Sequence, residues 1–229
     1  MNKENIQEKV YNLHKQIWIN QNDLWPDDRP SLIDMLHPKE VCRLLGINYE
    51  EHDELGRFGN KGVRFETAGI IDRKAKKIAV SNKPKQEVVR FTAAHELGHW
   101  ILHPNEIMHR DRPINDLDIL KTSRPLSEQE ADYFAACFLM PPKLLKDIFE
   151  KTFLTGIPLH IDEHTAFWLN QNDPHSLLYT DEERLDREIA VASCQSYKCR
   201  HIHSLAGQFK VSKTAMAIRL KELGFIQWP

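Results

Sequence analysis

Apolar residues in the first part of the chain follow two different spacings. Over residues 3–20 they recur every three or four positions among charged residues, which predicts an amphipathic opening helix. A turn-rich stretch at 26–31 separates this helix from a short one over 38–46, which has a proline near its start and a glycine at its stop. Residues 62–81 are rich in β-prone side chains on either side of a polar stretch at 72–76, and this pattern predicts a β-hairpin.

The next predicted element is a helix that is apolar on nearly all sides, running from Pro84 to His103, where Pro104 stops it. A helix without a polar face belongs in the interior of a domain, so we expect this one to be buried and central. Gly98 lies in its middle, where glycine costs about 1 kcal/mol of helix stability relative to alanine. A residue that small at that position indicates that another element packs closely against it.

The remainder of the chain has a mostly helical pattern. A polar loop over 105–124 leads to a helix over 128–140, which a pair of prolines ends. Beyond about residue 145 the sequence shows further helical segments, without an internal repeat or a low-complexity tract. We therefore predict an α+β fold, with a first domain over 1–145 that includes an N-terminal helical extension, and a mostly helical C-terminal region over 146–229.

Composition and charge narrow the class of protein without identifying its chemistry. The 229 residues are 41% hydrophobic and 28% charged, the balance of a globular protein with room for a substantial core. The net charge of −2 gives no overall attraction to nucleic acid or membranes. No apolar run approaches the length of a membrane span, and the polar N-terminus does not resemble a secretory signal. We therefore expect a cytoplasmic protein whose four cysteines are reduced.

The strongest chemical signal is the sequence His-Glu-Leu-Gly-His at residues 95–99, inside the predicted buried helix. Two histidines at i and i+4 share one face of a helix, which is the spacing that a zinc ion needs. Glu96 lies about a third of a turn away, within reach of a water molecule beside the metal but outside its ligand shell. The arrangement predicts metal-assisted hydrolysis, with a peptide bond as the expected substrate, and makes ordinary core histidines the weaker interpretation of His95 and His99.

A catalytic zinc usually has three protein ligands and one open position, so a third ligand is needed. A third histidine at the metzincin spacing would require glycine at 102 and histidine at 105, where the chain has Leu102 and Asn105. His103 lies on roughly the same helix face as His95, but about 12 Å further along the axis at ~1.5 Å per residue, too far for a shared ligand shell. We therefore interpret His103 as a supporting or capping group.

The next predicted helix offers acidic candidates for the third ligand. Glu128 and Glu130 are about 200° apart around the helix, so only one of them can face inward. Glu130 shares its face with Phe134 on the apolar side, whereas Glu128 shares its face with Asp132 and is expected to face water. A buried carboxylate calls for a cation, which makes Glu130 the predicted ligand. The alternative is that Glu130 and Ser127 form a capping box at the start of the helix.

Two motifs follow one another in the chain: Phe-Thr-Ala-Ala-His-Glu-Leu-Gly-His at 91–99, with His103 after it, and Glu-Ala-Asp-Tyr-Phe-Ala-Ala-Cys-Phe-Leu-Met-Pro at 130–141. Together they resemble the metallopeptidase segment of the ImmA/IrrE family. The preceding predicted hairpin fits the family order, and the segment 211–226 is similar to the family's C-terminal tail. The similarity covers residues 60–226 with gaps, and both motifs in order are far more specific than His-Glu-x-x-His alone.

The resemblance implies a zincin-like metalloprotease fold, in which a small β-sheet packs on the helix that carries His-Glu-x-x-His. It implies one zinc ion per chain on His95, His99 and Glu130, with Glu96 as the catalytic acid and base. Members of the family are intracellular endopeptidases that typically cleave a helix-turn-helix transcriptional repressor and thereby switch on mobile-element or stress-response genes. A protein substrate of that kind is therefore the expected partner, although residues 1–45 align with nothing in the family.

Peptide hydrolysis passes through a tetrahedral oxyanion that needs a hydrogen-bond donor. Tyr133, His103 and His109 are candidates for that donor, or for groups that support the ligands from behind. Each can donate a hydrogen bond, and each lies in or between the two motifs. The sequence does not choose among them.

The C-terminal segment over 202–226 gives the alternative interpretation of the chain. Its pattern is compatible with a helix-turn-helix in which Ser212 caps the second helix. Residues 198–221 also include six Lys or Arg and no Asp or Glu. The alternative function is therefore a DNA-binding regulator in which the zinc site is a sensor. We favour a helical segment that packs on the catalytic domain or on a substrate, because Lys210 occupies a turn position usually given to glycine, and the second helix offers few base-reading side chains.

Four more side chains that can bind metal lie close together in the sequence: Cys194, Cys199, His201 and His203. Their spacing is not one of the common zinc-finger patterns, so we do not expect a second zinc site there. A metal analysis that found two zinc ions per chain would contradict this.

Overall fold

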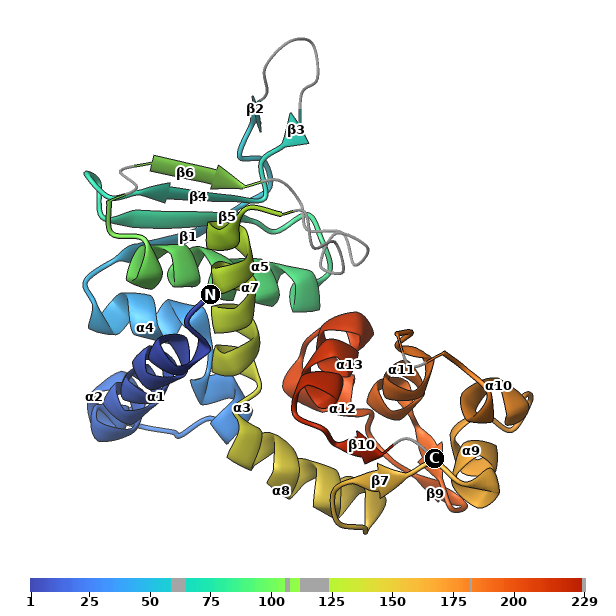
Figure 1. Ribbon diagram of the computed structural model, residues 1–229. Helices are drawn as coiled ribbons and strands as arrows, with labels where there is room; N and C mark the ends of the chain where they lie inside the picture. The colour runs from blue at the N-terminus through green and yellow to red at the C-terminus, as the bar shows by residue number, and fades with distance from the viewer. Residues whose placement is uncertain (59–64, 106–107, 112–123, 182, 228–229) are drawn as a thin grey trace. The chain divides into compact units, whose positions relative to one another are not determined.

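The structure is a computed structural model that describes residues 1–58, 65–105, 108–111, 124–181 and 183–227 (Figure 1). The chain divides into two compact units, Met1–Leu139 and Met140–Pro229. The fold is α+β, as predicted: the first unit combines a small sheet with helices, and the second is mostly helical. Within the described ranges, no helix has the length and apolar character needed to cross a bilayer.

A four-stranded sheet forms one layer of the first unit, with the strand order β1-β5-β4-β6. The predicted hairpin is confirmed for its described part, because β4 and β5 pair antiparallel around the polar turn, while residues 62–64 lie outside the described residues. β1 is parallel to β5, and β6 is antiparallel to β4. The predicted polar loop over 105–124 is therefore wrong where β6 forms. The strands of this unit are β1 (Asn48–His52), β2 (Arg57–Phe58), β3 (Phe65–Glu66), β4 (Gly69–Asp72), β5 (Lys77–Ser81) and β6 (Met108–Asp111).

The helices of the first unit pack beneath this sheet and against one another. α5 contacts both central strands, β4 and β5, and α7 crosses α5 (Figure 1). Every residue of α5 from Val89 to His99 is buried, as the all-round apolar pattern predicted. α1 packs on α7, and its buried residues are Ile6, Val10 and Ile17. The helices are α1 (Lys3–Ile19), α2 (Gln21–Leu24), α3 (Leu32–Met35), α4 (Pro38–Leu44), α5 (Gln86–Leu102) and α7 (Leu126–Leu139).

The crossing of α5 and α7 occurs at small residues. A Cβ atom added to Gly98 would lie 3.1 Å from the Cα atom of Ala131 and 3.1 Å from the ring of Phe134. These distances are shorter than an ordinary van der Waals contact, so the helix backbones approach as closely as they do only because residue 98 is glycine. The close packing inferred from the sequence at Gly98 is confirmed.

The C-terminal end of α5 is held by an arginine from the turn between β4 and β5. Nη2 of Arg73 donates to the carbonyl oxygens of His99, Trp100 and His103 at 3.0, 2.9 and 2.9 Å. Its guanidinium group also lies 4.6 Å from the centre of the Trp100 ring. The last carbonyls of a helix have no partner within the helix, so a cation at this position satisfies them and complements the helix dipole. The sheet and the histidine-bearing helix are thereby joined.

The second unit consists of short helices and two small two-stranded sheets. β7 is parallel to β10, and β8 forms an antiparallel hairpin with β9. The unit begins at Met140, a few residues before the boundary predicted between 145 and 146, which falls inside α8 (Pro142–Phe153). Its elements are α8 (Pro142–Phe153), β7 (Leu159–His160), α9 (Glu163–Leu169), α10 (His175–Leu178), α11 (Asp186–Ser193), β8 (Ser196–Tyr197), β9 (Arg200–His201), α12 (Leu205–Phe209), α13 (Lys213–Glu222) and β10 (Ile226–Gln227).

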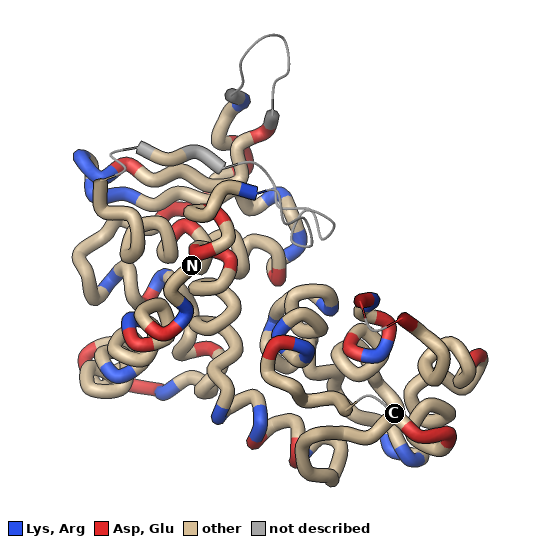
Figure 2. The backbone as a smooth tube through the Cα atoms, in the orientation of Figure 1, with Lys and Arg blue, Asp and Glu red and all other residues tan. Residues whose placement is uncertain are grey.

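The predicted helix-turn-helix segment forms α12 and α13. Lys210 adopts the left-handed conformation at the end of α12, with φ of 55°, and Ser212 caps α13 by accepting from the Ala215 N–H. Most of α13 is buried, including Arg219, which donates to the carbonyl of Met140. Lys and Arg residues are interspersed with Asp and Glu residues along the backbone of this unit (Figure 2). The segment therefore has the predicted local structure, but its second helix serves largely as core.

Candidate metal centre

Helix α5 brings the two histidines of the His-Glu-x-x-His motif together. Their spacing of four residues places both imidazoles on one side of the helix, and both side chains are 0% exposed. The Nε2 atoms of His95 and His99 lie 3.0 Å apart. Two buried imidazoles that direct the same nitrogen toward one point form two adjacent corners of a metal site.

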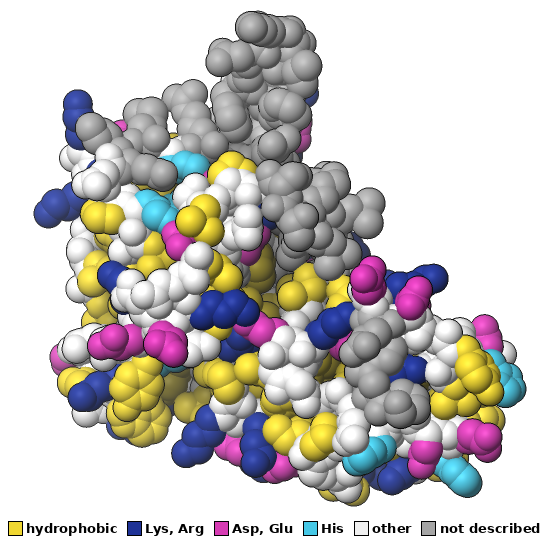
Figure 3. All heavy atoms as spheres, viewed as in Figure 1, with side chains coloured by type: hydrophobic (Ala, Val, Ile, Leu, Met, Phe, Trp, Pro, Cys, Tyr) yellow, Lys and Arg dark blue, Asp and Glu magenta, His cyan; other side chains and the backbone are white. Residues whose placement is uncertain are grey.

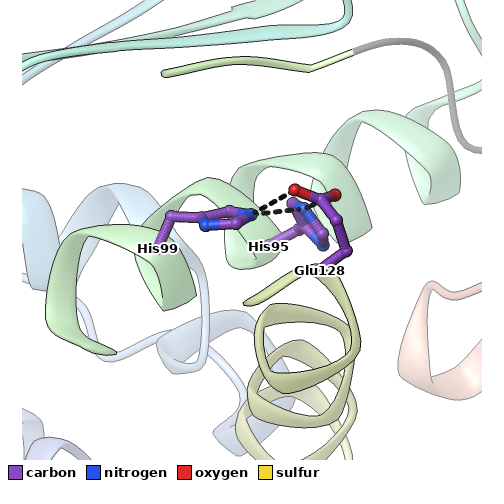
Figure 4. Close-up of side chains that lie close together, drawn as sticks. All are labelled: His95, His99 and Glu128. Atoms are coloured by element: carbon purple, nitrogen blue, oxygen red, sulfur yellow. Dashed lines mark hydrogen bonds and ion pairs between the residues drawn. The ribbon is translucent and has the colours of Figure 1, made fainter. Parts of the chain in front are cut away.

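Glu128 supplies the third corner from the first turn of α7 (Figure 4). Its carboxylate oxygens lie 3.5 Å from Nε2 of His95 and 3.4 Å from Nε2 of His99. Ligands at the usual zinc distances of about 2.0–2.1 Å in a tetrahedron are about 3.4 Å from one another. The two imidazole nitrogens and the carboxylate of Glu128 therefore fit a single small divalent ion. Among the described residues, this is the one group of three whose ligand atoms converge in this way.

The prediction that Glu128 faces water is wrong. Its side chain is 13% exposed and points toward the histidines, whereas Glu130 lies on the other side of the helix crossing and contacts His103. The physical reason is that α7 meets α5 at Ala131, so residues 128 and 130 flank the contact on opposite sides. The structure thus brings Glu128 to the histidine pair and does not bring Glu130 there. The capping-box alternative fails too, because α7 begins at Leu126 and Ser127 lies inside its first turn.

A second carboxylate on α7 holds His95 from behind. Oδ1 of Asp132 lies 2.8 Å from Nδ1 of His95. Because a carboxylate only accepts, Nδ1 of the neutral imidazole carries the proton, and Nε2 keeps its lone pair for a metal. Arg124 contacts the second oxygen of Asp132 and also donates to Glu128 at 3.1 Å, so one guanidinium fixes both carboxylates. Neither Asp132 nor Arg124 was identified from the sequence, although Asp132 and Glu128 were recognised as sharing a helix face.

His103 lies behind His99, away from the point where the Nε2 atoms converge. Its Nδ1 is 3.0 Å from Nδ1 of His99, and its Nε2 is 3.1 Å from Oε2 of Glu130. The interpretation of His103 as a supporting group rather than a ligand agrees with this geometry. Glu130 belongs to the same chain of contacts.

The carboxylate of Glu96 lies against the sheet. Glu96 is fully buried, and a Cβ atom added to Gly69 on β4 would lie 2.5 Å from its Cδ atom and 2.6 Å from its Cγ atom. No side chain larger than hydrogen therefore fits at position 69 while Glu96 keeps this position. The requirement for glycine at 69 comes from packing between strand and helix, and no pattern within the strand indicates it.

The two remaining candidates from the sequence lie in different places. The ring of His109 on β6 stacks on the ring of His99 with centroids 4.0 Å apart, and its Nε2 is 3.5 Å from Oε1 of Glu128. Tyr133 faces α1, where its hydroxyl accepts from Gln7 and Lys3 lies over its ring. The structure thus brings His109 to the centre and does not bring Tyr133 there. Histidine side chains of the first unit reach the surface beside the sheet (Figure 3).

Electrostatics favour the ligand forms of these side chains. Burial alone would raise the pKa of Glu128, but its interactions with His95 and His99 outweigh that effect and hold the pKa well below its ordinary value. Burial lowers the pKa of His99, which opposes the charged imidazolium. An ionised carboxylate and neutral imidazoles are the states that bind a metal.

The second group of candidate ligands does not converge. Sγ of Cys194 donates to the carbonyl oxygen of Ser196, and Cys194 is buried while Cys199 is exposed. Cys194, Cys199, His201 and His203 do not bring three ligand atoms together within the described part of the chain.

Part of the chain matches a known protein family. Residues 45–155, just under half of the chain, match the family Peptidase_M78, described as the IrrE N-terminal-like domain. The matched segment contains the sheet, α5 and α7, and therefore every residue of the centre described above. No curated protein matches the chain.

Proposed function

Because residues 45–155 belong to the M78 peptidase family, as an IrrE N-terminal-like domain, we propose that this protein is a zinc-dependent endopeptidase. The observation that carries the proposal is the convergence of His95, His99 and Glu128 on one point. Two imidazole nitrogens and one carboxylate oxygen form a donor set typical of catalytic zinc, with a fourth position left for a reactant. We also propose that the sheet and α5 form a zincin-like fold, since the sheet packs on the helix that bears the motif.

The proposed mechanism assigns the proton transfers to Glu96. When bound, zinc supplies a Lewis acid that polarises the scissile carbonyl and acidifies water. Glu96 follows His95 on the same helix, and its carboxylate is held between α5 and Gly69. From there it takes a proton from the attacking water and returns it to the departing amine, as a general base and then a general acid. Its buried position keeps bulk water from competing for that proton.

His109 is the proposed donor to the substrate oxyanion. It lies beside Glu128 and His99, and its side chain is 18% exposed, so a substrate can reach it. His103 is engaged with His99 and Glu130, and Tyr133 faces α1, which disfavours both for this role. A donor to the developing oxyanion stabilises the transition state more than the bound substrate.

The proposed substrate is a small helix-turn-helix transcriptional repressor, and the proposed outcome is derepression of mobile-element or stress-response genes in the cytoplasm. The support for this class is the resemblance of the two motifs to intracellular proteases of that kind. The test is to incubate the zinc-loaded protein with the repressor encoded nearest its own gene. Wild type should cleave it, and Glu96→Gln should retain zinc while cleaving about 10²–10⁴-fold more slowly. Undiminished cleavage by Glu96→Gln would remove Glu96 from its role.

The alternative, a DNA-binding regulator with a zinc sensor, has less support. α13 would have to present its side chains to DNA, yet most of them are buried in the second unit. Binding of duplex DNA that weakens steeply as salt is raised would favour the alternative. Absence of binding at low salt would eliminate it.

A further inference from the structure

We propose that His103 and Glu130 are positioning residues that act in series to hold His99 in its ligand orientation. The inference rests on the proposed metal centre and extends it to two residues outside the ligand set. Its evidence is a continuous chain of contacts: Nδ1 of His99 to Nδ1 of His103 at 3.0 Å, and Nε2 of His103 to Oε2 of Glu130 at 3.1 Å.

The direction of each hydrogen bond follows from the chemistry of the Glu130 carboxylate, the last group in this series of contacts. A carboxylate of Glu130 only accepts, so Nε2 of His103 carries a proton and donates it. A neutral imidazole has one protonated nitrogen, so Nδ1 of His103 accepts, and the hydrogen between the two Nδ1 atoms belongs to His99. Nε2 of His99 then carries no proton, and its lone pair is directed toward the point that it shares with His95 and Glu128. The contacts made by His103 and Glu130 therefore select the tautomer of His99 that can bind a metal through Nε2.

His103 is fixed well enough to act in this way. It is the C-cap residue of α5, and its backbone N–H donates to the carbonyl of His99 at 3.0 Å. Its own carbonyl accepts from Arg73 at 2.9 Å. Contacts from α5, from the β4–β5 turn and from α7 thus set the position of one imidazole. A ligand held from behind by a rigid partner loses less freedom when it binds a metal.

The two histidine ligands are held by different sets of contacts. His95 contacts the carboxylate of Asp132 directly, and Arg124 contacts the same carboxylate. His99 reaches its carboxylate only through a second imidazole. The two supports lie on opposite sides of the helix crossing, which explains why α7 carries Glu130 as well as Asp132. It also gives Glu130 a role that requires no contact with the metal.

The test is the zinc dissociation constant, measured by competition with a chromophoric chelator. His103→Leu and Glu130→Leu should each weaken zinc binding about 10–100-fold, the usual cost of losing such a partner. In the double variant the losses should not add, because both residues act through one chain. His103→Asn should recover most of the affinity, since its amide oxygen can accept from His99 in place of the imidazole. His164→Leu and Glu163→Leu, exposed residues on α9, serve as matched controls and should bind as wild type does.

A second readout reports the tautomer directly. Nitrogen-15 spectra of the zinc-loaded wild type should show His99 protonated at Nδ1, with that proton protected from exchange with water. The protection should disappear in Glu130→Leu, provided that circular dichroism shows it to be folded. Zinc affinity of both leucine variants within about twofold of wild type would overturn the inference. So would a His103→Asn variant as weak as His103→Leu, since that points to packing alone. If His99→Ala binds zinc as tightly as wild type, the metal centre itself is wrong.

Discussion

Two regions of this chain carry enough histidine, cysteine and acidic side chains for a metal site, and they differ in what the backbone does with them. In the first, α5 aligns His95 and His99, and α7 adds Glu128 to the same point. In the second, Cys199 lies at the exposed turn of the β8–β9 hairpin, with φ of 60°, while the thiol of Cys194 is buried and donates to a backbone carbonyl.

The comparison shows that residue types alone predict a metal site less well than the groups that orient the ligand side chains. His95 and His99 each have a partner at Nδ1 that fixes the tautomer, and Arg124 orients the carboxylate of Glu128. Burial raises the pKa of Cys194, so its thiol remains protonated and is a poor ligand. Ligands on two crossing helices converge, whereas those on a short hairpin and the segments beside it do not.

The largest expected effect is on metal binding. His99→Ala removes one of three protein ligands. If each ligand carries roughly a quarter to a third of a zinc-binding free energy of about 10–16 kcal/mol, affinity should fall by about 10²–10⁴-fold. The double variant Cys194→Ser with Cys199→Ser should bind zinc as wild type does. Protection of Cys199 from alkylation by stoichiometric zinc would contradict the distinction between the two regions.

The next effect concerns the space reserved for Glu96. Gly69→Ala places a Cβ where the Glu96 carboxylate lies, so the side chain must move. Displacing a catalytic group by about 1 Å can cost 10²-fold in rate, and we expect a loss of kcat of that order with zinc content unchanged. Gly156→Ala, where nothing lies within 4 Å of the added Cβ, is the matched control. A Gly69→Ala enzyme with wild-type kcat would show that Glu96 does not act from this position.

A smaller effect is expected at the helix crossing. Gly98→Ala improves helix propensity by about 1 kcal/mol, but its Cβ meets the backbone of Ala131, which cannot move without shifting α7. Overpacking of this kind costs about 1–3 kcal/mol, so urea unfolding of the metal-free protein should show a net loss of up to about 2 kcal/mol. A stabilised variant would mean that the crossing is looser than described.

The smallest effect compares the ligand histidines with His14, a partly buried histidine outside the centre. Its Nε2 lies 3.0 Å from the carbonyl oxygen of Phe138, and burial lowers its pKa below the ordinary value of 6.5. The unfolded state therefore binds the proton more readily, so stability is complete above about pH 6.5 and declines as pH falls below it. His14→Gln should flatten this decline in urea unfolding of the metal-free protein. An unchanged pH profile would assign the decline to other groups.

Much of the fold could be predicted because it is encoded by local patterns. The i, i+4 spacing placed His95 and His99 on one face, the apolar pattern identified α5 as central, and Gly98 indicated the close crossing. The choice between Glu128 and Glu130 could not be made in this way, because it depends on which residue of α7 meets α5. A pattern of apolar residues predicts which face of a helix is buried. It does not predict where polar side chains are buried as well.

Strand β6 was missed for a related reason. Its sequence, Met-His-Arg-Asp, lacks the alternation of a half-buried strand, because it forms the edge of the sheet next to β4. The position of His109 beside the centre follows from this pairing, in which it is the register partner of Ile71. Pairing between strands far apart in the sequence cannot be predicted from the residues of one strand alone.

The most direct measurement is the zinc content of Glu128→Ala and Glu130→Ala, purified identically and analysed after dialysis against saturating zinc followed by weak chelator. We expect Glu130→Ala to retain close to one zinc ion per chain with lowered affinity, and Glu128→Ala to lose nearly all of it. The opposite result, with zinc retained by Glu128→Ala and lost by Glu130→Ala, would contradict the metal centre described here.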